Sequence, residues 1–341
     1  MDTRKVQQLG PSTLAMTLPA RWAAEHEVEK GDEVSLRYGR GTLTVVPGSV
    51  RSTDSEATVD ASGLNGNALE RAIVSQYVLG RRIINIEAAE TLQSDQINAV
   101  YEAQTRLMGL GVIEETPTSI AIRCSVDPAD FTLDSLLERL ESTGSTMRTE
   151  AIDAIADATP ELAQRALNRE RQANKIFMLL LRLIFTAYRN PTLAQAVGLD
   201  DGLPLLGYRS IVKNLELIAD DAEDIAEVAV AAGEDGLDID AEAMSRVQSY
   251  TNEVDEMSEL AVQAAVQRDH DTATAVRERF PEIESRGETI LTELPEMDNQ
   301  SLLRVRAVLV SLGEVAQYAV RNAEVATNLA LDEESEHITI N

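Results

Sequence analysis

A duplicated helical segment constrains this chain more than any other feature. Residues 214–229, NLELIADDAEDIAEVA, recur as residues 311–326, SLGEVAQYAVRNAEVA, and seven of the sixteen aligned positions are identical. Several of these identities fall three, four or seven residues apart, so the same face of a helix is present twice. A repeat of this kind indicates a duplicated architecture.

A second match extends the duplication. Residues 147–154, MRTEAIDA, align with residues 257–264, MSELAVQA, at an offset of 110, whereas the first pair has an offset of 97. The difference matches a longer connection after Asn190 in the first copy. Each copy has a pattern that predicts three helices of very roughly 25 residues. We therefore expect two three-helix repeats, at 131–232 and 237–331.

The composition favours a helical protein from a salt-rich cytoplasm. Aromatic residues make up 4% of the 341 residues, which is low for a β-rich protein and natural for a bundle built on Ala, Leu, Ile and Val. The formal net charge is −28, and only four of the 30 basic residues are Lys. The acidic residues are spread along every predicted helix. We therefore favour salt adaptation over a local acidic patch made for a basic partner.

Neither a disulfide nor a membrane span is predicted. The single cysteine, Cys124, excludes an intrachain disulfide and a cysteine metal cluster, and the pattern SIAIRCSV favours a small core residue over a nucleophile. No signal peptide opens the chain, and Arg182 interrupts the most apolar run, IFMLLLRLIFTAY. That run is far short of the ~20 apolar residues that a span needs. We expect a cytoplasmic protein with no membrane insertion.

Residues 1–47 differ from the rest of the chain. They hold six basic and six acidic residues, so this segment is basic relative to the acidic remainder. Short alternating runs, KVQQL and TLAMTL, are followed by Pro19, a brief helix (ARWAAEH), a Gly31-Asp32 turn and two more strands, EVSLR and TLTVV. About 47 residues with so few large apolar side chains can hardly form a stable core alone. This favours a dimer.

This segment, RKVQQLGPSTLAMTLPARWAAEHEVEKGDEVSLRYGRGTLTVV, resembles the SpoVT/AbrB-type swapped-hairpin DNA-binding domain over its whole length. The resemblance implies an interleaved homodimer in which each chain lends a hairpin to a shared barrel. Basic side chains near the first strand and the helix start contact DNA in that family, and the matching candidates here are Arg4, Lys5 and Arg21. The alternative is a pure dimerisation module. Because phosphate contacts weaken steeply as salt rises, DNA binding in a salty cytoplasm would also need base-edge contacts and dimer symmetry.

A linker and a small α/β segment follow. Residues 48–66 are rich in Ser, Thr, Gly and Asp, which predicts a linker. Residues 67–130 predict a connector of three strands (RRIINIEA, GVIEET and TSIAIRCSV) and two helices, the second capped by Ser94 or Asp95. Nothing in the connector has catalytic spacing, so we expect it to couple the two ends of the protein mechanically. Residues 332–341 predict an acidic tail.

The helical repeats resemble the PhoU family of phosphate-uptake regulators over about residues 132–331. The AbrB-like start and the α/β insert make the whole arrangement similar to an archaeal, haloarchaeal branch of that family. The most specific motif is LELIADDAEDIAEVA, with an earlier counterpart near NRERQANKIFMLLLR. The resemblance implies two three-helix halves and a phosphate ABC transporter or its signalling subunit as partner. It also implies divalent metal bound through a Glu/Asp-x-x-x-Asp pattern.

One carboxylate pair of that pattern is intact. Glu216 and Asp220 lie four residues apart, so they share a helix face and suit a divalent ion. In the earlier motif, Glu170 is followed by Asn174, so an amide replaces the second acid. The corresponding positions of the second copy are Phe280 and Glu284, and Gly313 and Gln317. The candidate metal ligands are Glu216 and Asp220, with Glu170 as a further candidate; the degraded pattern favours a solvated acidic face instead.

No other chemistry emerges, because the three histidines are far apart in the sequence and no phosphate-cradling Gly loop is present. We predict a multidomain, mainly α protein with a swapped-hairpin β domain, a small α/β connector and a duplicated six-helix PhoU-like bundle. The predicted function is non-enzymatic regulation of phosphate uptake or of phosphate-responsive transcription. Two alternatives remain open: a regulator that binds a phosphate transporter or its kinase without touching DNA, and a metal-binding helical bundle.

Overall fold

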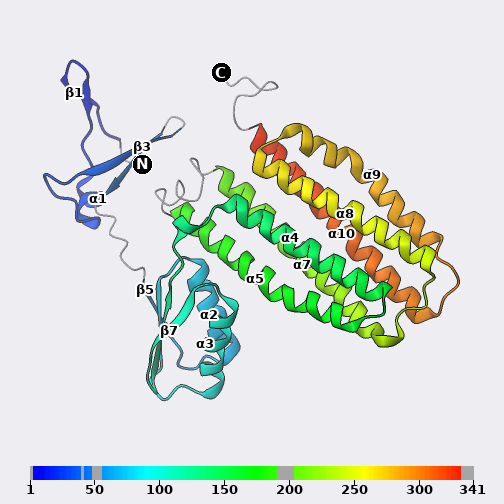
Figure 1. Ribbon diagram of the computed structural model, residues 1–341. Coiled ribbons are helices and arrows are strands. Elements are labelled where there is room, and N and C mark those ends of the chain that lie inside the picture. Colours follow the sequence, from blue (N-terminus) through cyan, green and yellow to red (C-terminus); the bar gives the residue numbers. More distant parts are fainter. Residues whose placement is uncertain (1–2, 40–41, 48–55, 190–202, 332–341) are drawn as a thin grey trace. The chain divides into compact units, whose positions relative to one another are not determined.

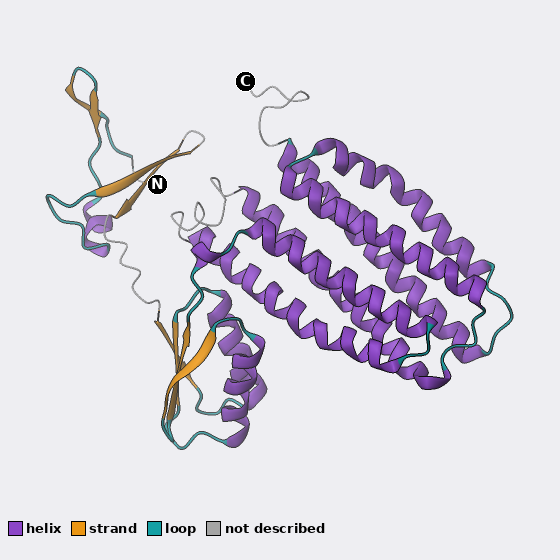
Figure 2. Ribbon diagram, viewed as in Figure 1, coloured by secondary structure: helices purple, strands orange, loops and turns teal. Residues whose placement is uncertain are grey.

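In this computed structural model the described residues are 3–39, 42–47, 56–189 and 203–331. The chain divides into two compact units, Met1–Asp54 and Ser55–Asn341. The first unit contains the short strands, and the second contains the connector and the helical bundle (Figures 1 and 2).

The first unit consists of two antiparallel hairpins and a short helix. β1 (Gln7–Gly10) pairs with β2 (Thr13–Ala15), and β3 (Val34–Gly39) pairs with β4 (Thr42–Pro47). Between the hairpins, α1 (Ala20–Glu25) begins directly after a proline, whose fixed φ suits a helix start. The predicted order of strands and helix is present.

The described residues of this unit form no buried hydrophobic core. None of its residues with a described burial is buried. Six of its large apolar side chains are exposed: Val6, Leu9, Leu14, Met16, Leu36 and Leu43. Soluble folds rarely leave so much apolar surface open in so short a segment.

The connector is a four-stranded sheet with two helices. Its strands are β5 (Glu56–Asp60), β6 (Ile83–Glu87), β7 (Leu110–Glu115) and β8 (Ser119–Cys124), in the spatial order β5-β6-β8-β7. β5 and β6 are parallel, and the other two pairings are antiparallel. α2 (Gly66–Val78) and α3 (Ser94–Arg106) pack together. Alternate residues of the central strands are buried, among them Cys124, as expected for a core cysteine.

Two details of the connector differ from the sequence prediction. The predicted linker at 48–66 contains strand β5, because Ala57 and Val59 alternate with polar residues and the strand pairs with β6. The polar residues of the strand, Glu56, Thr58 and Asp60, lie on its exposed positions, so composition alone hid the period of two. The cap of α3 is Gln93, one residue earlier than predicted, in a reciprocal capping box with Gln96.

Six long helices make up the described part of the bundle, as predicted. They are α4 (Leu133–Ala156), α5 (Pro160–Arg189), α7 (Leu203–Ala232), α8 (Ala241–Gln267), α9 (His270–Thr292) and α10 (Asn299–Ala330). In the first half α4 packs on α5 and α7, and in the second half α8 packs on α9 and α10. The halves meet through α7 with α10 and α4 with α8, so the bundle has one continuous core (Figure 1).

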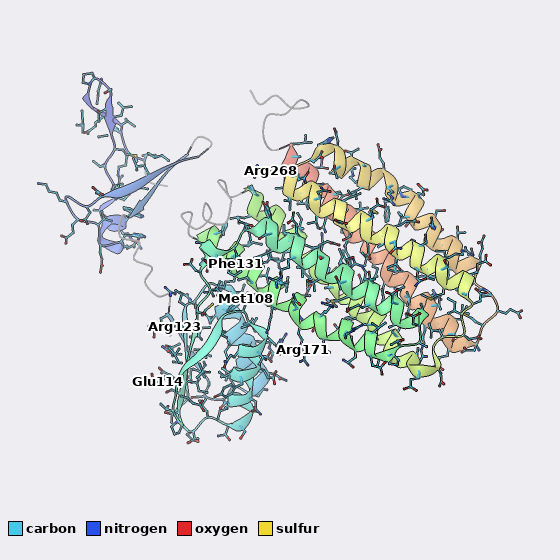
Figure 3. All side chains as sticks on the ribbon, viewed as in Figure 1. Met108, Glu114, Arg123, Phe131, Arg171 and Arg268 are labelled. Carbon is cyan, nitrogen blue, oxygen red and sulfur yellow. The ribbon has the colours of Figure 1, made fainter. Side chains whose placement is uncertain are left out.

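A buried arginine joins the connector to the bundle. The guanidinium of Arg182, on α5, donates hydrogen bonds to the carbonyl oxygens of Tyr77, Gly80 and Arg81 at the end of α2, and it stacks on the Tyr77 ring at 4.8 Å. A cation suits this place because the carbonyls at a helix C-terminus carry partial negative charge. Met108 packs at the same junction (Figure 3). Sequence reasoning saw in Arg182 only an interruption of an apolar run.

Candidate functional site

The first half of the bundle brings the predicted acidic residues together. Glu170 and Asn174 on α5 face Glu216 and Asp220 on α7 across a shallow groove, here called the acidic groove. Its remaining lining is apolar: Leu140, Ala173, Phe177 and Ala219. Spacing of four residues places each pair on one helix face, and the packing of α5 on α7 turns both faces toward each other.

A lysine of the same chain already pairs with one carboxylate of the groove. The ammonium of Lys213 forms an ion pair with Glu216, and the amide of Asn174 donates a hydrogen bond to Glu170. Partial burial raises the pKa of Asp220 to about 6; the charge of Glu216 adds to this rise, and Lys213 opposes it. The groove has essentially no free internal volume. One of its three carboxylates is therefore paired with a cation of the protein itself.

This donor set does not fit a resident divalent metal. Lys213 neutralises Glu216, and the amide of Asn174 donates to Glu170, so two of the three carboxylates are engaged. Across the described residues, no group of three or more His, Cys, Asp or Glu side chains is placed to hold a metal ion. A metal at Glu216 and Asp220, with Glu170 as a further ligand, stays a prediction. Elemental analysis of protein purified without chelators tests it.

The corresponding region of the second half is hollow. Phe280 and Glu284 on α9 face Gly313 and Gln317 on α10 around a cavity of about 300 Å³, here called the second-half hollow. Its floor includes the buried ring of Tyr250. The positions that the duplication aligned therefore come together in both halves, but their chemistry differs completely.

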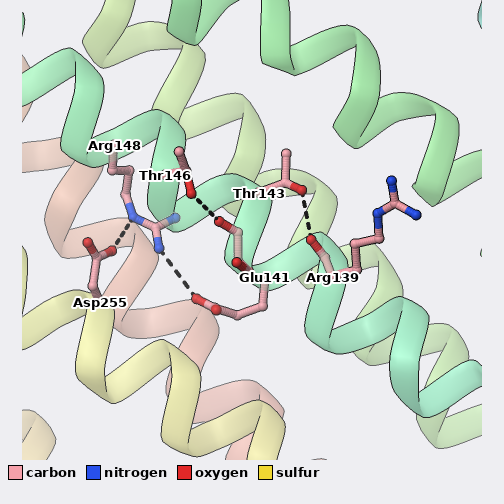
Figure 4. A network of polar contacts seen from close by, with 7 residues as sticks. Arg139, Glu141, Thr143, Thr146, Arg148 and Asp255 are labelled. Carbon is pink, nitrogen blue, oxygen red and sulfur yellow. Dashed lines mark hydrogen bonds and ion pairs between the residues drawn. The ribbon is translucent and has the colours of Figure 1, made fainter.

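A buried ion cluster links the two halves beneath these surfaces. Arg148 on α4 is fully buried; its Nε donates to Asp255 on α8 at 2.5 Å, and its guanidinium lies 3.6 Å from Glu141 (Figure 4). Burial raises the pKa of Glu141 to about 7; the charge of Arg148 opposes this rise, and Asp255 adds to it. Sequence reasoning missed this cluster, since Arg148 and Asp255 lie 107 residues apart.

A second polar contact crosses between α7 and α10. Asn214 donates to Asn322 at 2.8 Å, and both belong to the duplicated segment. Nearby, burial raises the pKa of Asp221, and its contact with Glu314 raises it further, because the two carboxyls share this space. The interface between the halves therefore includes polar contacts in addition to buried Ala and Val.

The predicted DNA-contacting residues lie on the surface of the first unit. Arg4 and Lys5 are exposed just before β1, and Arg21 is exposed near the start of α1. The Nε of Arg21 donates to Glu25, four residues later, at 2.8 Å. Such an exposed i,i+4 pair is weak, so the guanidinium can exchange it for another anion.

Comparison with known proteins supports the interpretation of both the helical repeats and the N-terminal segment. The family model of the PhoU domain matches residues 137–229. The model described as antidote-toxin recognition MazE, bacterial antitoxin, matches residues 7–52. The crystal structure of PhoU from Pseudomonas aeruginosa is similar in fold, with a TM-score of 0.50 and 20% sequence identity. That similarity covers 58% of this chain and 94% of the other. No curated protein matches the chain.

These findings show a PhoU-like helical bundle preceded by an AbrB/MazE-like segment. The match to the PhoU model falls on the first half of the bundle, α4 to α7, which also holds the acidic groove. Among the described helices, none combines the length and the apolar character that crossing a membrane requires.

Proposed function

We propose that this protein regulates phosphate uptake or phosphate-responsive transcription, without enzymatic activity of its own. The observation that carries the proposal is the PhoU domain match over residues 137–229, together with the PhoU-like fold of the bundle. The bundle receives the signal, in contact with a phosphate ABC transporter or its signalling subunit. The charge of −28 fits a salt-rich, haloarchaeal cytoplasm as the working environment.

The N-terminal unit acts as a dimeric head in this proposal. Its exposed apolar side chains, including Leu9, Leu14 and Leu36, need a partner surface, and a second copy of the same hairpins supplies one of matching character. The match to a MazE-type model over residues 7–52 supports a homodimer of the swapped-hairpin type. Dimer symmetry would also present two copies of the basic residues to DNA.

DNA contact in the proposal comes from Arg4, Lys5 and Arg21. All three are exposed, and they belong to a segment that is neutral in an otherwise acidic chain. Phosphate contacts alone would be weak at molar salt. We therefore assign sequence recognition to side chains that reach base edges in a symmetric site.

The mechanical connection runs through the connector. Arg182 ties the end of α2 to α5, the helix that also carries Glu170 of the acidic groove. A change in the packing of α5 therefore reaches the connector directly. In our proposal this connection passes the state of the bundle toward the head.

The deciding experiment is recovery of genomic DNA fragments on the purified protein in molar KCl, beside a variant lacking residues 1–47. We expect a few promoters to be enriched by the full chain and lost with the truncation. A triple variant with Arg4, Lys5 and Arg21 changed to Gln should lose the same fragments while remaining dimeric in sedimentation.

The opposite result would favour the protein-interaction regulator. If no fragment is enriched at any salt concentration, the head serves only as a dimerisation clamp. Co-purification with transporter ATPase subunits that is unaffected by deleting residues 1–47 would then assign the function to the bundle alone.

A further inference from the structure

The second-half hollow differs from the acidic groove at the position of one cation. The offset of 97 that aligns the duplicated segment places Val310 of α10 at the position of Lys213 of α7. In the first half, Lys213 supplies the ammonium that pairs with Glu216. In the second half, Val310 is apolar, 51% exposed, and lines the hollow. The internal cation of one half is therefore absent from the other.

Two glycines open the space that this change leaves. Gly313 stands where the first half has Glu216, and a Cβ added to Gly313 would meet no atom within 4 Å. Gly287 stands where the first half has Phe177, and a Cβ there would lie only 2.8 Å from the hydroxyl of Tyr250. The result is an open cavity of about 300 Å³, whereas the acidic groove is filled.

The walls of the hollow combine aromatic and anionic groups. Tyr250 is 1% exposed and lines the hollow. Phe280 provides a second ring, and Glu284 and Glu288 lie at the rim. Neither of these two glutamates forms an ion pair with any described Lys, Arg or His. The hollow thus has acceptors and ring faces but no cation.

We propose that the second-half hollow binds an organic cation, an alkylammonium or guanidinium group, which takes the place that Lys213 fills in the first half. The ring faces of Phe280 and Tyr250 attract a cation through their quadrupoles, and Glu284 supplies a formal negative charge beside them. The Tyr250 hydroxyl accepts a hydrogen bond from an N–H of the guest. This assignment is independent of phosphate regulation and of the head.

The same walls argue against other classes of ligand. An anion would meet Glu284, Glu288 and Glu314 with no basic side chain lining the hollow. A divalent metal prefers several hard oxygen ligands, but the lining is largely apolar, and no group of three or more His, Cys, Asp or Glu among the described residues is placed to hold a metal ion. The apolar volume instead suits the carbon chain of an amphipathic cation.

The test is methyl NMR of the full chain titrated with n-butylguanidinium and n-butylammonium, with n-butanol as the uncharged comparison. We expect shifts confined to methyl groups around the hollow, including those of Val310 and Leu291, with a dissociation constant on the order of millimolar for so small a probe. Equal shifts from n-butanol would overturn the proposal, since they would show an apolar hollow without charge preference.

Three variants separate the contributions. Glu284→Gln should weaken binding of both cations about fivefold. Val310→Lys restores the internal ammonium of the first half and should abolish binding. Glu278→Gln is the matched control, because it removes one charge from the same helix outside the hollow and should leave binding unchanged. A melting temperature close to wild type confirms that each variant is folded.

Two outcomes would contradict the assignment outright. If Glu278→Gln weakens binding as much as Glu284→Gln, the cations only screen the acidic surface. If Val310→Lys binds the probes as well as wild type, the cation site lies elsewhere. A further experiment identifies the natural ligand by comparing n-butylguanidinium with a short peptide that has one central Arg. If the peptide binds at least about tenfold tighter, the ligand is an Arg side chain of a protein. If the two affinities are equal, the ligand is a free amine or guanidine.

Discussion

The N-terminal unit and the helical bundle are stabilised in opposite ways. The unit at residues 3–47 has no described buried residue and exposes six large apolar side chains. The bundle buries Leu, Ile, Val and Ala along all six of its described helices and encloses the charged group of Arg148 as well. The described residues of the N-terminal unit therefore form no buried core within one chain, whereas the bundle does. In the proposed dimer the stability of this unit depends on protein concentration, and the stability of the bundle does not.

Replacing Arg148 by Ala tests the bundle side and has the largest expected effect. The substitution leaves Asp255 and Glu141 enclosed without their cation, so the free energy of unfolding should fall by about 3–5 kcal/mol. Denaturant unfolding followed by circular dichroism measures the loss. Arg169→Ala is the matched control, because its partly exposed pair with Glu150 should cost less than about 1 kcal/mol. Equal losses in the two variants would mean that burial of charge does not distinguish the bundle.

Replacing Arg182 by Met removes only the hydrogen bonds between the connector and the bundle, so it tests how far the stability of the bundle depends on its contact with the connector. The apolar stem stays, but the carbonyl oxygens at the end of α2 lose their donors, so we expect a loss of about 2–3 kcal/mol. Amide hydrogen exchange should accelerate in residues 66–80 before it does so in the bundle. Arg171→Met, on the exposed side of the same helix, should change neither quantity (Figure 3). Unaltered exchange in α2 would contradict the role of Arg182.

The pH dependence of stability should identify Glu141. Burial raises the pKa of Glu141 from its ordinary value of 4.5 to about 7, so the fold favours the protonated form. The contribution of this carboxyl is therefore present at low pH and is lost as pH rises from about 4.5 to about 7, by roughly 1–3 kcal/mol.

Unfolding measured across this window compares wild type with Glu141→Gln. The variant should show a flatter pH profile, and the remaining slope comes from Asp220 and Asp221, whose pKa values are also raised. Self-association through the head should not change over the same pH range in either protein. An unchanged slope in the variant would show that Glu141 is ionised throughout.

Replacing Leu14 by Asp has the smallest expected effect on the bundle and a clear one on the head. A charge in the apolar surface of β2 should raise the dissociation constant of the dimer at least about tenfold, as measured by sedimentation. The free energy of unfolding of the helical bundle should change by less than about 0.5 kcal/mol. Thr3→Asp is the control, since it adds the same charge outside the strands. A dimer that survives Leu14→Asp would place its interface elsewhere.

The helical part of the fold could be predicted because its pattern is repeated. Identities at helical spacing in the segments 214–229 and 311–326 locate the third helix of each half, and α7 and α10 contain them. The strand β5 could not be found in this way, because its polar positions made five residues look like part of a linker. A single alternating pair of apolar residues is too short a signal against such a background.

The candidate sites divide along a similar line. Equivalent positions of the two copies line equivalent sites, because the duplicated halves share their backbone geometry. Glu170 and Glu216 line the acidic groove, and Phe280 and Gly313 line the second-half hollow. What the sequence leaves open is which charge pairs with which. The engagement of Glu216 by Lys213 and the burial of Arg148 against Asp255 depend on side-chain packing between helices, which periodicity does not encode.

The buried position of Arg182 has a consequence for the mechanical connection between the bundle and the connector in the second unit. Glu170 and Arg182 lie on the same uninterrupted helix, twelve residues or about 18 Å apart along its axis. α5 therefore connects the two points through one continuous helix. A displacement of α5 relative to α7 would also move Arg182 and the carbonyl groups at the end of α2 that it binds.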